Sequence, residues 1–306
     1  MPKLFALLTV FTCLSGAANA PIREVTSQAA EGSGMPVAAF FKGYIYWAGR
    51  ENPLTIYTPD GYPAAYFLAP EKTAQAIAAD TDGGLAIAWR TETSGGIDLF
   101  GASRELVRTI ETGRYRPQHL SFAEDHSLWT LGYQTRAGHA EMWDDSAYMI
   151  VRKFLPNGQQ AGAYLPRSLF PHGLPPGDEA WQWSNCITVA HNRVGLWVVS
   201  GMYSGETEWV ELDLDGNLTG RWRLDPFSYE LRVAFTSDGH VFVQHADLDP
   251  QNHTLTYSLL TLDRASSTWQ PAQSAPGGRL VSADGDALIF AERSSGPIHL
   301  RWYPHP

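Results

Sequence analysis

Cysteine is nearly absent from this chain of 306 residues, which contains only Cys13 and Cys186. Cys13 lies in a segment that we expect to be removed, so the remaining chain has no second cysteine for an internal disulfide. Stability must therefore come from the packing of secondary structure rather than from covalent cross-links. Cys186 adjoins a predicted inner strand and is expected to be a small buried apolar residue.

Charged residues are also few, at 18% of the chain, and the formal net charge is −10. Lys and Arg form no run, so nothing in the sequence attracts nucleic acid or an anionic membrane surface. We therefore expect no nucleic-acid partner. Beyond the first residues, no segment is long and apolar enough to span a bilayer.

The patterns of several enzyme classes are missing. The chain has no G-x-S-x-G nucleophile turn, no H-E-x-x-H zinc motif, no phosphate-binding glycine loop and no dinucleotide fingerprint. Helical periodicity of useful length is missing as well. The sequence therefore indicates an all-β protein and names no catalytic residue.

The N-terminus has the pattern of an export signal. Lys3 supplies the positive start, residues 4–14 (LFALLTVFTCL) the apolar stretch, and residues 15–20 (SGAANA) the small residues before cleavage. This pattern predicts a signal peptide over residues 1–20 and a secreted or periplasmic protein. Pro21 is a poor residue after the cut, so cleavage after Ala17 or Ala18 remains an alternative.

What the chain does contain is a repeat. Six times, an apolar β-like run stops at a tight-turn signal and resumes as a second run, with units that begin near residues 38, 76, 119, 187, 231 and 279. Asp-Gly and Asn-Gly pairs, such as 82–83, 157–158 and 238–239, favour two-residue hairpin turns. Four short strands per unit, repeated about every 40–50 residues, are typical of a β-propeller blade.

We therefore predict one domain over residues 21–306, an all-β, six-bladed propeller of four-stranded antiparallel blades. The sixth unit supplies only three strands, which would leave an unpaired edge. The segment 22–28 (IREVTSQ) is extended and belongs to no other unit. We predict that it adds as the outer strand of the last blade and closes the ring.

The segments 231–243 (LRVAFTSDGHVFV) and 208–220 (EWVELDLDGNLTG) carry a resemblance to a known group. A strand, an Asp-Gly turn, a second strand and a strand ending in Asp-x-Asp-Gly follow one another, as in the six-bladed NHL-repeat and gluconolactonase-like propellers. The resemblance covers nearly the whole mature chain and implies the fold alone. The Asn-x-Arg element of NHL repeats is missing, and the gluconolactonase metal ligands have no counterparts here.

The connections divide into two faces when the strands of each blade are lettered A to D from the channel outward. A-to-B and C-to-D turns share one face, the tight-turn face, and all of them are short. B-to-C and D-to-A connections share the other, the loop-rich face, which receives the long segments 134–147, 166–186 and 246–255. Long loops on a rigid scaffold commonly carry function, so we place the ligand site on this face.

The candidate ligand-binding residues fall into three groups. Aromatic rings would supply stacking area and carboxylates would accept hydrogen bonds, while a third group lies where strands enter the channel mouth. These residues are Trp143, Trp181 and Trp183; Asp144, Asp145, Asp178 and Glu179; and Arg116, His119 and Glu230. Alternatively, the tryptophans pack the loops onto the scaffold, and the arginine pairs with acidic groups and holds the blades together.

Three functions remain open at this point, because propellers host all of them. The first is an exported binding module for a small polar ligand, a glycan or a peptide segment, with no cofactor. The second is a lactonase-type or hydrolase-type enzyme, in which loop carboxylates and His139 or His172 hold a divalent cation that polarises a carbonyl or activates water. The third is a scaffold for a protein partner.

Overall fold

The computed structural model describes residues 20–27, 40–41, 44–46, 54–57, 63–137, 139–143, 148–170, 187–200, 206–224, 231–249, 251–252, 254–272, 277–293 and 298–305. Secondary structure in these ranges is β-strand, with one short 3-10 turn, η1 (Arg167–Leu169). Across the same ranges, no helix has the length and apolar character needed to cross a membrane. The predicted signal peptide lies outside the described residues, apart from Ala20.

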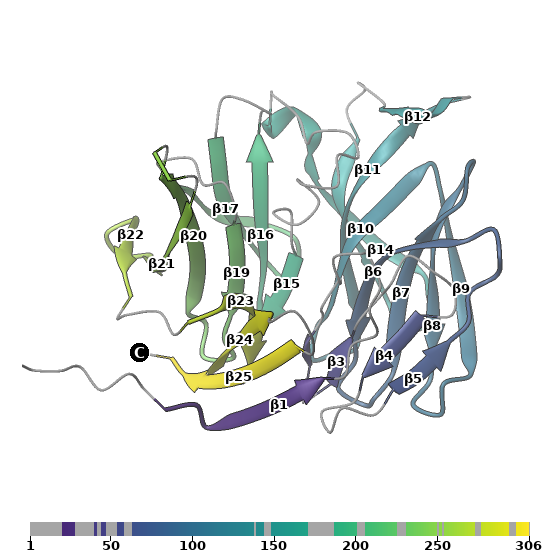
Figure 1. Cartoon of the computed structure of the whole chain (residues 1–306). Coiled ribbons are helices and arrows are strands. Elements are labelled where there is room, and N and C mark those ends of the chain that lie inside the picture. The colour runs from purple at the N-terminus through teal and green to yellow at the C-terminus, as the bar shows by residue number, and fades with distance from the viewer. Residues whose placement is uncertain are drawn as a thin grey trace, which may run out of the picture.

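The strands pair into antiparallel sheets in chain order (Figure 1). The first sheet contains β2 (Phe40–Phe41), β3 (Tyr44–Tyr46), β4 (Leu54–Tyr57) and β5 (Pro63–Tyr66). The next contains β6 (Thr73–Ala79), β7 (Leu85–Arg90), β8 (Gly95–Phe100) and β9 (Leu106–Gly113). The third contains β10 (Tyr115–Phe122), β11 (Leu128–Arg136), β13 (Met149–Phe154) and β14 (Gln160–Pro166), and β12 (His139–Trp143) adds to β11.

The second half of the chain repeats this order. One sheet contains β15 (Ile187–Ala190), β16 (Arg193–Ser200), β17 (Glu206–Asp213) and β18 (Leu218–Leu224). Another contains β19 (Leu231–Phe235), β20 (Val241–Asp249), β21 (Thr254–Asp263) and β22 (Thr268–Pro271). The last contains β23 (Arg279–Asp284), β24 (Ala287–Arg293), β25 (Ile298–Pro304) and, as its outer strand, β1 (Arg23–Ser27).

The first strands of successive sheets lie against one another. β6 contacts β10, β10 contacts β15, β15 contacts β19, β19 contacts β23, and β2 contacts both β23 and β6. Each sheet then extends outward from this inner strand through hairpins. This is the arrangement of a β-propeller, in which sheets pack face to face around a common axis.

The prediction of six four-stranded blades needs a correction, because the structure supports five full blades. The inner strands of these five have four to eight residues. The sheet from β2 to β5 has strands of only two to four residues and does not count as a full blade among the described residues. One full blade has five strands instead of four, because β12 pairs with β11. Apolar runs and turn signals locate hairpins, but they do not state how many residues pair.

The predicted closing strand is confirmed. β1 pairs antiparallel with β25, with Arg23 opposite Trp302 and Ser27 opposite Ile298. Val25 packs against the apolar cluster formed by Ala287, Ile289, Leu300 and Trp302. The N-terminal segment therefore covers the edge of the sheet that holds the C-terminal strands, as Figure 1 shows for the purple and yellow strands.

Replacing Val25 with Asp tests this closure. The carboxylate would enter the apolar cluster without a partner, and we expect the free energy of unfolding to fall by about 1–3 kcal/mol. Thr26→Asp places the same charge on the exposed face of the same strand and is expected to cost under about 0.5 kcal/mol. Urea denaturation of both variants measures the difference. Equal losses would show that Val25 does not pack in this way.

Neighbouring blades are also joined by a buried ion pair. Glu211 on β17 is fully buried and accepts hydrogen bonds from Arg264 Nη2 at 2.6 Å, Arg193 Nη1 at 2.8 Å and Trp209 Nε1 at 2.8 Å. Arg264 comes from the turn after β21, in the adjacent sheet. Burial raises the pKa of Glu211, but the hydrogen bonds from Arg264 and Trp209 lower it more, so the net shift is downward.

Glu211→Gln is expected to destabilise the fold by about 3 kcal/mol, since it leaves two arginines without their carboxylate. This is the lower end for buried pairs, because both arginines are partly exposed. Glu208 also lies on β17, and Glu208→Gln, which breaks its more exposed pair with Arg221 of β18, is expected to cost under about 1 kcal/mol. Urea denaturation at neutral pH measures both losses.

The pH dependence of Glu211 gives a second readout of the same variants. A carboxyl group whose pKa is lowered by folding stabilises the protein above its unfolded pKa, which is about 4.3, and this contribution is lost as the pH falls through the folded pKa. The difference in the free energy of unfolding between wild type and Glu211→Gln, measured by urea denaturation, should therefore narrow below about pH 4.3. A gap that is constant with pH would contradict the ion-pair assignment.

Candidate functional site

The connection after β11 was predicted to be a loop over residues 134–147, and the structure forms most of it as strand. β11 continues to Arg136, and β12 then returns along it, with Thr135 opposite Trp143 and Arg136 opposite His139. In the view of Figure 1, β12 stands above the neighbouring strands. This connection on the loop-rich face is therefore a two-stranded extension of the blade.

The predicted loop 246–255 is also corrected. β20 continues to Asp249 and β21 begins at Thr254, and Ala246 lies opposite Tyr257 in the ladder between them. Only residues 250–253 connect the strands. The Asp, Pro and Asn residues favour a loop in the sequence, but pairing satisfies the backbone polar groups along most of the segment.

Most of the predicted ligand-binding residues lie outside the described residues. These are Asp144, Asp145, Asp178, Glu179, Trp181, Trp183 and Glu230, together with His172 of the enzyme alternative. Trp143 is the last residue of β12 and His139 is the first, and the positions of their side chains are not described. The clustering of these residues around one pocket stays a prediction.

Arg116 and His119 lie on β10, where that strand leaves the loop-rich face. Arg116 is 3% exposed, and its guanidinium donates to the backbone oxygens of Thr91 at 3.0 Å and Glu92 at 3.3 Å, in the connection after β7. Burial lowers the pKa of Arg116. These contacts support the alternative in which the arginine joins neighbouring blades, and its contact with a ligand stays a prediction.

The tight-turn face holds clusters of titratable residues that are not among the predicted site residues. The turns that follow β6, β10 and β19 carry acidic residues, and those after β10 and β19 also carry a histidine. The described ranges contain two groups of carboxylates and imidazoles whose donor atoms lie within 4.8 Å of one another. One sequence signal was available. In the turns at 125–126 and 238–240, a histidine follows an aspartate within two residues.

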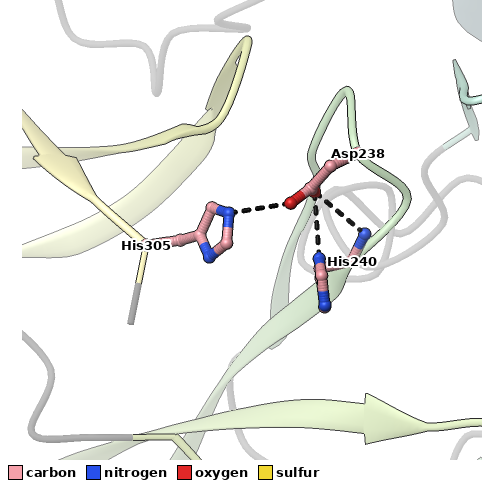
Figure 2. Close-up of side chains that lie close together, drawn as sticks. All are labelled: Asp238, His240 and His305. Carbon is pink, nitrogen blue, oxygen red and sulfur yellow. Dashed lines mark hydrogen bonds and ion pairs between the residues drawn. The ribbon is translucent and has the colours of Figure 1, made fainter.

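The first group, the Asp238 cluster, consists of Asp238, His240 and His305 (Figure 2). Asp238 and His240 belong to the turn between β19 and β20, whereas His305 follows β25 in the neighbouring sheet. Asp238 Oδ1 lies 3.0 Å from His240 Nδ1, and Asp238 Oδ2 lies 3.0 Å from His305 Nε2. One carboxylate therefore bridges two imidazoles from two blades.

Several groups fix the orientation of Asp238. The buried Thr236 donates its hydroxyl to Asp238 Oδ1 at 2.5 Å, and the backbone N–H of His240 donates to the same oxygen at 3.4 Å. Burial raises the pKa of Asp238, but the hydrogen bonds from Thr236 and His240 lower it more and hold it well below its usual range. The carboxylate is therefore ionised at neutral pH.

The second group, the Asp80 cluster, consists of Asp80, Asp82 and His126 and joins the first hairpin turns of two neighbouring sheets. His126 Nδ1 lies 2.9 Å from Asp80 Oδ1 and 3.0 Å from Oδ2. The hydrogen bond to Asp80 and the negative charge of that carboxylate raise the pKa of His126. This group contains one imidazole and two carboxylates, in contrast to the Asp238 cluster.

The raised pKa of His126 predicts a pH-dependent stability. The pair with Asp80 stabilises the fold fully below the unfolded pKa of histidine, which is about 6.5, and this contribution is lost as the pH rises through the higher folded pKa. His126→Asn removes the imidazole and tolerates the φ of 61° at this position. Urea denaturation should show that this variant loses more of the free energy of unfolding, relative to wild type, at about pH 5.5 than at about pH 8.5. An equal or reversed loss would contradict the pairing.

Comparisons with known proteins identify the fold alone. No family model matches the chain, and no curated protein matches it by sequence. Among solved structures, the β-propeller domain of the Trilobed protease from Pyrococcus furiosus, described as having an open velcro topology, is similar with a TM-score of 0.50 at 8% identity, over 74% of this chain and 65% of that chain. This chain is a β-propeller.

A second solved structure is a protein of unknown function from Bacteroides caccae, with a TM-score of 0.49 at 13% identity over 80% of each chain. The propeller fold is confirmed, whereas the NHL-repeat or gluconolactonase-like group is not. At these identities, the activities of similar structures do not transfer to this β-propeller.

Proposed function

We propose that the protein is an exported β-propeller that acts as a binding module and takes a small polar ligand, a glycan or a peptide segment on its loop-rich face. The observation that carries this proposal is β12, which adds a fifth strand to one blade in the connection between β11 and β13. Export is inferred from the signal pattern in residues 1–20.

The added strand supports binding through the backbone that it orders. It ends at Trp143, opposite Thr135, so the backbone that carries this tryptophan is fixed by pairing rather than by a loop. Aromatic rings on an ordered backbone supply contact area to sugars and peptides at a low entropy cost.

β12 also favours one ligand class over the others. Among the described strands, β12 pairs only with β11. Its other edge pairs with no strand of the described ranges, and an extended peptide can add to such an edge through its backbone N–H and C=O groups. A peptide segment is the ligand class that this geometry favours most.

The hydrolase alternative receives no further support. The two described groups of carboxylates and imidazoles lie on the tight-turn face, away from the loops to which that alternative assigned its cation. The scaffold alternative shares the loop-rich face with the binding module, and the same experiment separates the two.

Peptide and glycan arrays followed by titration of the best hit test the proposal. We expect Trp143→Ala to weaken binding about tenfold or more, equivalent to about 1.4 kcal/mol, without lowering the melting temperature. The control is Phe67→Ala, which removes an aromatic ring from a residue that is 70% exposed next to β5.

Unchanged affinity in the Trp143 variant would remove this residue from the site. Arrays without any hit, together with one stoichiometric protein partner in a pull-down, would replace the binding module with a protein scaffold.

A further inference from the structure

We propose that the Asp238 cluster binds one divalent transition-metal ion of the zinc type. This ion would link the end of β25 to the turn between β19 and β20 in the neighbouring blade. The inference rests on the tight-turn face and does not depend on the ligand of the loop-rich face. It adds a structural metal site to the fold.

The donor atoms already converge. A carboxylate oxygen of Asp238 and one ring nitrogen each of His240 and His305 lie within 4.8 Å of one another. Donors of a tetrahedral zinc ion lie about 2.0–2.2 Å from the metal, which places them about 3.3–3.6 Å from each other. His240 Nδ1 lies 3.0 Å from Asp238 Oδ1, and His305 Nε2 lies 3.0 Å from Oδ2, so side-chain rotations that bring one oxygen within reach of both nitrogens open the space that an ion needs. Figure 2 shows Asp238 between the two rings.

The donor set selects the class of metal. Two imidazoles and one carboxylate suit zinc, nickel or copper, whereas magnesium and calcium prefer oxygen donors alone. Three protein donors leave a coordination position for water. The side chains of His240 and Asp238 are 53% and 37% exposed, so an ion reaches them directly from solvent.

The surroundings hold the ligands in place, as expected around a metal site. Thr236 is fully buried and fixes the Asp238 carboxylate through its hydroxyl. The ring of Phe242 lies 6.4 Å from that of His240 and 5.6 Å from that of His305, measured between centroids. Both imidazoles therefore lie beside a buried aromatic side chain.

The Asp80 cluster is the natural comparison and is the weaker candidate. It contributes one imidazole, and His126 Nδ1 is within hydrogen-bond distance of both Asp80 oxygens. The backbone N–H of Thr81 donates to Asp80 Oδ1, and that of Gly84 donates to Asp82 Oδ1. The turn engages the carboxylates of both clusters, so the difference is the single imidazole of the Asp80 cluster, which makes His126 a suitable control position.

An ion at the Asp238 cluster would strengthen a junction that the structure already builds. The backbone N–H of Ser237 donates to the carbonyl of Gly285 at 3.0 Å, joining the turns of the two sheets. His305 directly follows β25, which pairs with β1. The bound ion would therefore link the sheet that contains both the first and the last described strands to the neighbouring sheet.

Isothermal titration of tag-free protein with zinc chloride tests the proposal, together with thermal unfolding in zinc and in EDTA. We expect one equivalent of zinc to bind, and the melting temperature to rise with free zinc because the metal binds only the folded state. His240→Gln, His305→Gln and Asp238→Asn should each weaken binding about tenfold or more. His126→Asn should bind zinc as wild type does.

Circular dichroism of the variants in EDTA checks that each is folded, which is expected because Asn and Gln keep side-chain hydrogen-bonding groups at these positions. A wild-type protein that binds no zinc would overturn the inference. Zinc binding that the three cluster variants leave unchanged would place the ion elsewhere in the chain and overturn it as well. Stabilisation by calcium equal to that by zinc would overturn the assignment to imidazole donors.

Discussion

Antiparallel pairing between β1 and β25 is the constraint on which the rest of this propeller depends. The chain has no pair of cysteines outside its first residues that could cross-link its ends. Its first and last described strands are joined instead by a hydrogen-bond ladder and by the packing of Val25 onto Leu300 and Trp302. An unpaired β25 would expose a row of backbone polar groups. The sequential contacts of the inner strands are consistent with this closure, because each sheet needs a neighbour on both sides to bury its two faces.

Polar contacts reinforce the apolar packing between blades, and they differ between the two faces. Near the loop-rich face, Arg116 reaches the carbonyls of the connection after β7. Glu211 receives Arg264 from the next sheet, and at the tight-turn face Asp238 receives His305 in the same manner. Charged side chains that span two sheets fix the blades relative to each other, so the connections on one face and the His–Asp clusters on the other are placed by a single framework.

The β-propeller, the pairing of strands within blades and the closing N-terminal strand were all predictable from the sequence, because alternating apolar runs and Asp-Gly turns are local signals. Prediction was less accurate where pairing overrides composition. Residues 246–249 contain two aspartates and precede a proline, yet they pair in β20, and residues 139–143 form the added strand β12. The short strands from β2 to β5 were not distinguished from full blades, since apolar content alone does not set strand length.

The residues alone determined the repeat, the turn positions and the need for a closing strand. The first two depend on neighbours within a few positions, and the third follows from a last unit that lacks its fourth strand. Only the tertiary structure decided that His305 meets Asp238 beside His240, and that His126 meets Asp80. These contacts join residues of different blades that are remote in sequence. The turn pattern of one blade carries no information about which side chain of the next blade will face it, because that depends on how the sheets pack rather than on local backbone preference.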